Sequence, residues 1–251
     1  MNSIATSSIV FACVFGGALL GMCIRRLLPH DHLSEESKGV VRIAMGLVAT
    51  MTALVLGLLI SSAKSSFDAV SSEITATSSK IIILDRISAN YGPDTQEARN
   101  LLRSVVANII DQLDPKKPAD PTHLSVPTRE LDSISEKIGG LTPKDDRQRL
   151  LQAEALSTLK EIRQTRWLIY EQRSNSISMP MLIILVWWLT ALFISFGLYA
   201  PANGTVVTSL LVSALSVSCA ILLILELYAP YRGVIRISSA PLRAALAQLA
   251  N

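Results

Sequence analysis

Long hydrophobic runs without charged residues dominate the chain and predict transmembrane helices. No Asp, Glu, Lys or Arg occurs in residues 4–24, 43–63 or 174–225. Because a helix rises ~1.5 Å per residue and a bilayer core is ~30 Å thick, about 20 apolar residues suffice for one crossing. The third run is interrupted at residues 200–204, where Pro201 and Gly204 mark a turn, so it predicts two crossings. We therefore predict four spans, at residues 4–24, 43–63, 179–199 and 205–226.

The first run has no positively charged residue before it, and its basic pair Arg25 and Arg26 follows the apolar stretch. A cleaved signal peptide has the opposite arrangement, with the basic residues first. We therefore expect a retained span.

A polar segment, residues 64–178, separates the second and third spans, and its pattern predicts helices. It holds 16 basic and 16 acidic residues, so its net charge is zero. No Gly or Pro occurs between Leu58 and Tyr91, which predicts that the second span continues as one helix beyond the membrane. Helices are further predicted from Asp94 to about Leu113, from Thr128 to Ile138, and from Thr142 towards Pro180, feeding directly into the third span.

Capping signals define the starts of two of these helices. Asp94, with Glu97 three residues later, resembles a capping box. Thr142 is the predicted N-cap of the last helix, with Pro143 and Asp145 in its first turn. The fold class is accordingly all-α integral membrane, divided into residues 1–63, 64–178, 179–226 and a tail of 227–251.

The distribution of basic residues predicts the orientation. With four spans, both termini and the polar segment share one side of the membrane. That side carries, near the bilayer, Lys64, Arg163, Arg166, Arg173, Arg232, Arg236 and Arg243, and the other side carries Arg25, Arg26, Lys38 and Arg42. The positive-inside rule places the richer side in the cytoplasm. We expect a multi-pass membrane protein with cytoplasmic termini.

Several segments carry a resemblance to a known family. They are residues 57–68 (GLLISSAKSSFD), 84–86 (LDR), 91–93 (YGP), 193–203 (FISFGLYAPAN), 226–230 and 237–243 (ISSAPLR), with Gly233. Together they resemble a bacterial four-span membrane family labelled bestrophin-like, which implies a location in the bacterial inner membrane. Bestrophins are pentameric anion channels with four spans per subunit and helical cytosolic parts, so the resemblance implies this topology and, as an expectation, a channel. One departure is at residues 227–229, where the family often has a charged pair before the proline.

The second span carries the strongest candidate for an ion path. Gly46, Thr50, Ala53, Gly57, Ser61 and Lys64 recur at intervals of three or four and share one helix face. Such a face favours close packing between helices, because small residues let backbones approach. It also suits a pore wall with hydroxyl groups and a positive ring at the mouth.

Three weaker membrane features are candidates for packing or for the membrane boundary. Gly17 and Gly21 form a Gly-x-x-x-Gly pair, and Ser209, Ser213 and Ser216 form a small stripe on the fourth span; we expect both to be packing faces. Glu226 ends the fourth span, where we expect it to meet water, Arg232 or Lys64.

Signatures of other functions are missing from the sequence. It has no phosphate-binding glycine loop, no His-Glu-x-x-His and no Gly-x-Ser-x-Gly, and its basic residues do not cluster as in nucleic-acid-binding proteins. His30 and His32 are too few for a metal site, so we expect no metal, no cofactor and no enzyme.

Two classes of function remain. The first is a homo-oligomeric ion channel, anion-conducting and lined by the second span, with the lipid bilayer and an inorganic anion as partners. The second is a non-conducting scaffold or sensor whose helical cytosolic domain binds other proteins.

Overall fold

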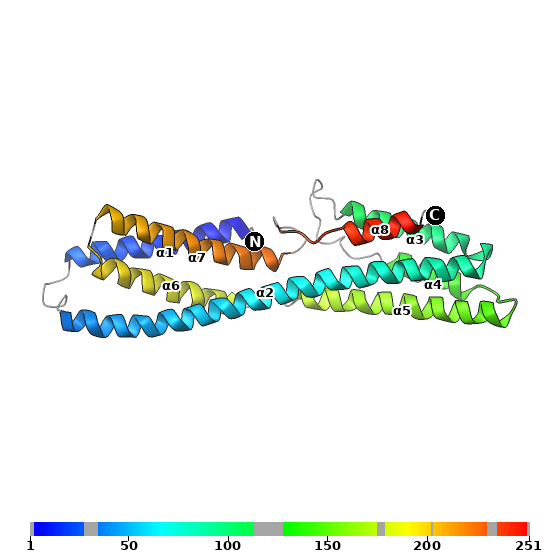
Figure 1. The fold of residues 1–251 in the computed structure, drawn as a ribbon, viewed down its shortest axis with the longest axis horizontal. Coiled ribbons are helices and arrows are strands. Elements are labelled where there is room, and N and C mark those ends of the chain that lie inside the picture. Colours follow the sequence, from blue (N-terminus) through cyan, green and yellow to red (C-terminus); the bar gives the residue numbers. More distant parts are fainter. Residues whose placement is uncertain are drawn as a thin grey trace. The chain divides into compact units, whose positions relative to one another are not determined.

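The computed structural model describes residues 3–27, 35–112, 128–174, 179–201, 203–229 and 235–249, and for 35–38, 112, 128 and 166–174 it describes the backbone alone (Figure 1). All regular structure in these ranges is helical. The elements are α1 (Ser3–Leu27), α2 (Glu35–Tyr91), the 3-10 helix η2 (Pro93–Thr95), α3 (Gln96–Gln112), α4 (Thr128–Gly139), α5 (Asp146–Ser174), α6 (Met179–Tyr199), α7 (Gly204–Leu227) and α8 (Ala240–Leu249).

Four of the helices are long and apolar enough to cross a bilayer, as the sequence predicts. They are α1, the N-terminal part of α2, α6 and α7. The all-α class with four membrane spans is thereby confirmed. The chain divides into a membrane unit, residues 1–66 and 176–235, and a polar unit, residues 67–175 and 236–251, with α2 contributing to both.

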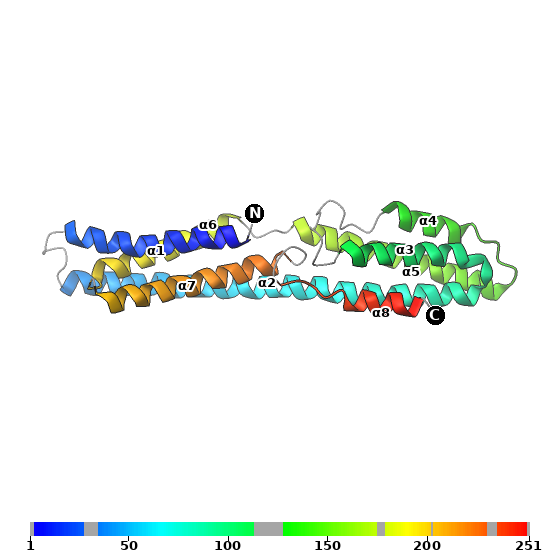
Figure 2. The same ribbon diagram turned by 90° about the horizontal axis from the view of Figure 1, so that it is seen from above.

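The core of the membrane unit lies between α1, α6 and α7, which run side by side in Figures 1 and 2. Val14, Leu185 and Ile221 are completely buried there. In soluble proteins, burying a side chain of this size contributes about 1.5–3 kcal/mol to stability. Within a bilayer, helix association is stabilised by close packing between the helices instead.

Glycines bring α1 and α6 into close contact. A Cβ on Gly21 would lie 2.1 Å from the carbonyl oxygen of Ile194, and one on Gly197 would lie 2.0 Å from that of Ala18. Gly17 faces Thr190 at 3.1 Å in the same way. The prediction that Gly17 and Gly21 form a packing face is confirmed.

The contact between α1 and α7 uses a serine that the sequence pattern did not single out. The buried Ser7 hydroxyl donates a hydrogen bond of 2.8 Å to the backbone carbonyl of Ser218. The predicted stripe of Ser209, Ser213 and Ser216 is instead exposed, so it does not pack within its own chain, and packing against another chain stays a prediction. Ser218 lies on the opposite, buried side of α7, and helix periodicity alone does not tell which side faces the neighbour.

The polar unit packs α3, α4, α5 and α8 with the C-terminal half of α2 (Figure 2). Leu84, Ile134, Leu159 and Leu249 are among its fully buried side chains. A bidentate ion pair between Arg99 and Asp85, with N–O distances of 2.7 and 2.9 Å, joins α3 to α2.

Both predicted helix starts in the polar unit are wrong in detail. Asp94 and Glu97 do not form a capping box, because the helical turn already begins at Pro93 with Gly92 as its N-cap, which places Asp94 inside that turn. The two carboxylates pair instead with Lys144 at 3.2 Å and with Lys137 at 2.5 Å. The N-cap of α5 is Asp145, whose side chain accepts a hydrogen bond of 2.6 Å from the Gln148 backbone N–H. The predicted junction between α5 and α6, at residues 175–178, lies outside the described residues.

Candidate functional site: the exposed face of α2

The membrane-spanning part of α2 presents three faces with different surroundings. Its packed face includes Thr52, Leu59 and Ala63, which are at most 4% exposed. The other two faces are exposed in the single chain, and they differ in side-chain size.

The first exposed face is the small-residue face, defined by the candidate residues from the sequence. The structure places all of them on the exposed surface of α2: Gly46, Thr50, Ala53, Gly57, Ser61 and Lys64. A Cβ added to Gly46 or Gly57 would meet no atom within 4 Å. Gly46 and Gly57 therefore differ from Gly21 and Gly197, because no close contact within the described part of the chain explains them.

The second exposed face is the large-residue stripe. It consists of Val40, Ile43, Leu47, Met51, Leu54 and Leu58, each between 50% and 78% exposed. At 100° per residue, the centre of this stripe lies about 90° around the helix from the centre of the small-residue face. Large aliphatic side chains suit contact with lipid chains or with a neighbouring helix, whereas the small-residue face leaves room beside the backbone.

Hydroxyl groups give the small-residue face its polar character. The Thr50 hydroxyl donates to the carbonyl oxygens of Gly46 at 2.7 Å and Leu47 at 3.0 Å. Bonded in this way, Thr50 is satisfied within its own helix and does not require water. Ser61 has no hydrogen-bond partner among the described residues, so its hydroxyl is available one turn from Lys64.

The candidate charges at the membrane boundary have different environments. Lys64 is exposed at the end of the small-residue face, whereas the Glu226 side chain is buried, with 6% of the residue exposed. The Glu226 carboxylate accepts a hydrogen bond of 3.4 Å from the Ile235 backbone N–H. Glu226 therefore serves the junction after α7, and Arg232 lies outside the described residues.

A hydrogen bond anchors α2 beside α7 near the same end. The Ser62 and Tyr228 hydroxyls are 3.0 Å apart. The neighbouring Ser61 lies about 100° further around the helix and makes no such contact. This hydrogen bond joins the Ser62 side of α2 to the residue that follows α7 in the same chain.

Arg42 is a functional candidate that the sequence analysis used only as a topological charge. It comes one turn before Gly46 and lines a cavity between α2 and α6. The signal in the sequence was its spacing of four residues from the first glycine of the small-residue face, on an edge of that face.

Other site chemistry is sparse in the described part of the chain. No group of three or more His, Cys, Asp or Glu residues there is arranged to hold a metal ion, and His30, His32 and His123 lie outside it. Cys13, Cys23 and Cys219 are free and exposed on the membrane helices.

These observations define an all-α membrane protein with four spans, one of which exposes a small, partly polar face. The Bestrophin-like domain matches residues 12–242, so the chain belongs to the Bestrophin-like family. This family is associated with channels rather than with enzymes. No curated protein matches the chain.

Proposed function

We propose that the protein is an oligomeric, anion-conducting channel of the inner membrane, in which the small-residue faces of several α2 helices line the pore. The observation that carries this proposal is the exposure of α2. Only 11% of its apolar window is buried in the subunit, against 33% to 39% for the other three spans. A span that its own subunit leaves uncovered is the natural element to surround a shared axis.

The dimensions of the face agree with a membrane path. Gly46 and Lys64 are 18 positions apart, which corresponds to about 27 Å along a helix. A bilayer core is ~30 Å thick, so the face extends over nearly its whole depth. Small side chains along this length keep a path open, and large ones on the neighbouring stripe would close it.

The charge at the end of the face favours anions. A unit charge 4 Å from an ion contributes about 4 kcal/mol at an effective dielectric constant of 20, and about 1 kcal/mol in bulk water. Repeated around a symmetry axis, Lys64 would form a positive ring at the pore mouth. We therefore assign anion preference to Lys64.

Reconstitution in liposomes tests this function. We expect the wild-type protein to conduct anions, and Lys64→Glu to lower anion over cation selectivity. The matched control is Lys160→Glu, because Lys160 is exposed in the polar unit and has no ion pair among the described residues. Selectivity should not change in this control.

Two results would contradict the proposal. Unchanged selectivity in a correctly assembled Lys64→Glu variant would remove the role of Lys64. Absence of any flux in the wild-type protein would favour the scaffold or sensor alternative.

A further inference from the structure

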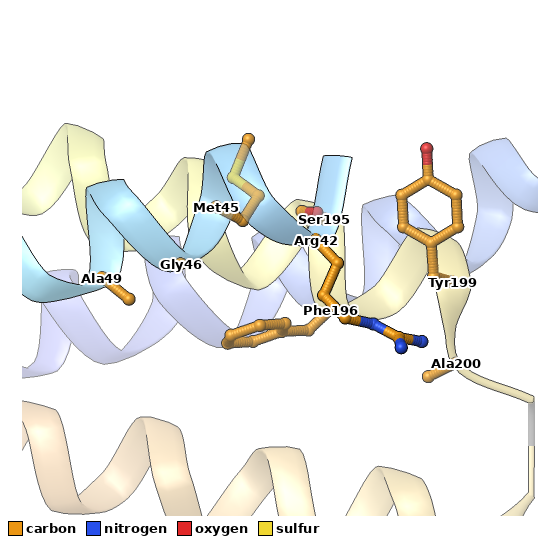
Figure 3. Close-up of a pocket in the computed structure, with 8 residues that line it drawn as sticks. All are labelled: Arg42, Met45, Gly46, Ala49, Ser195, Phe196, Tyr199 and Ala200. Carbon is orange, nitrogen blue, oxygen red and sulfur yellow. The ribbon is translucent and has the colours of Figure 1, made fainter. Parts of the chain in front are cut away.

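A cavity of about 470 Å³ lies between α2 and α6 within the membrane unit (Figure 3). Its volume falls within the range of about 300–1,000 Å³ that is typical of ligand sites. The walls include Arg42, Met45, Gly46 and Ala49 from α2, and Phe196 and Tyr199 from α6. Because α6 ends at Tyr199, the cavity lies at the end of the span, at the depth where lipid headgroups meet hydrocarbon.

The cavity combines apolar walls with one cation. Figure 3 shows Arg42 extending from α2 towards Ala200, with the Phe196 and Tyr199 rings on either side. No described residue forms an ion pair or a hydrogen bond with Arg42. Its charge is therefore available to an anion that enters the cavity.

A second guanidinium group adds to the positive potential at this point. Arg25 donates a hydrogen bond to the Ala200 carbonyl oxygen, which is also part of the cavity wall. The carbonyl group at the end of α6 is thus satisfied by Arg25. Arg42 remains for a ligand, and Ala200 lines the cavity together with Arg42.

We propose that this cavity binds an anionic phospholipid, with its phosphate group on Arg42 and one acyl chain against Ala49 and Phe196. Guanidinium groups bind phosphate by paired hydrogen bonds.

The apolar walls favour a lipid over free phosphate, since an inorganic ion would gain nothing from Phe196 or Met45. The inference is independent of conduction, because it depends on the cavity and its charge and not on a pore.

Native mass spectrometry of the purified full-length protein, titrated with dioleoyl phosphatidylglycerol, tests the inference. Loss of one charge-assisted contact weakens binding by about 1.5–3 kcal/mol, so we expect Arg42→Gln to bind at least about ten-fold more weakly. Arg26→Gln is the matched control, because Arg26 is exposed in the last turn of α1 and does not line the cavity. It should bind as the wild type does.

A second variant and two competitors complete the experiment. Ala49→Phe fills the apolar part and should also weaken binding, with helix content and assembly checked by circular dichroism and size-exclusion chromatography. Inorganic phosphate should not displace the lipid, and uncharged dioleoylglycerol should bind more weakly than phosphatidylglycerol.

Three outcomes would overturn the inference. The first is equal binding by Arg42→Gln and the wild type. The second is displacement of the lipid by phosphate alone, which would identify a simple anion site. The third is absence of lipid binding together with a changed oligomeric state in Ala49→Phe, which would identify the cavity as a contact between subunits.

Discussion

Three glycine-to-alanine variants separate packing within the subunit from the exposed face of α2. In Gly21→Ala, the new Cβ would lie 2.1 Å from the Ile194 carbonyl oxygen, whereas real Cβ contacts essentially never fall below 3.0 Å. The helices α1 and α6 must therefore move apart, and overpacking of this kind costs about 1–3 kcal/mol. Alanine regains about 0.5–1 kcal/mol of helix propensity. We expect a net loss of about 1–2 kcal/mol in the free energy of unfolding.

Gly16→Ala and Gly57→Ala provide the comparison. Neither added Cβ meets an atom within 4 Å, so each variant should keep its propensity gain and be no less stable than the wild type. The assay is unfolding followed by circular dichroism in a detergent that holds the protein monomeric. A loss of stability in Gly57→Ala equal to that in Gly21→Ala would refute the reasoning, because it would mean that the α2 face is packed inside the subunit.

Three further predictions concern the polar unit and the orientation. Asp85→Asn should destabilise the protein by about 3 kcal/mol in chemical denaturation, because Asp85 is 6% exposed and its loss leaves the Arg99 charge without its partner. The hydrogen bond and charge of Lys137 hold the pKa of Glu97 below its ordinary value. The pair therefore stabilises the fold at pH values above the pKa that Glu97 has in the unfolded chain, and this stabilisation is lost as the pH falls through the lower pKa of Glu97 in the folded protein. A carboxyl titration by NMR should show that pKa return to its ordinary range in Lys137→Ala. A reporter fused after Asn251 should be inaccessible from outside intact cells. Labelling of this reporter by an impermeant reagent would contradict the predicted cytoplasmic C-terminus.

The four spans could be predicted from the sequence because hydrophobicity over about 20 residues is a local property. The first residues of the helices in the polar unit were harder to predict from the sequence. Thr142 and Asp145 are both good capping residues, and the choice of Asp145 depends on which backbone N–H group its carboxylate reaches. The capping box failed because Gly92 is the N-cap and the turn begins at Pro93, one residue before Asp94.

The roles of side chains within the membrane could be predicted only in part, because they depend on contacts between helices that are distant in sequence. Gly17 and Gly21 were correctly expected to pack, yet their partner, α6, could not be read from spacing. The serine stripe of α7 has the same small side chains and lies exposed, because Ser218 on the other side meets Ser7. The small-residue face of α2 was identified by periodicity, and its role as a pore wall stays a prediction. The Arg42 cavity was missed, because it forms only when α2 and α6 come together.

Cysteine accessibility in a conducting preparation tests the central claim most directly. In a background without the three native cysteines, Gly57→Cys and Leu58→Cys place thiols on neighbouring positions that are both exposed in the subunit, about 100° apart around α2. If the small-residue face lines a water-filled pore, a charged methanethiosulfonate reagent should modify Cys at position 57 and reduce flux in liposomes, and it should leave position 58 unmodified. Equal modification at both positions, or unchanged flux with position 57 unmodified, would contradict the account.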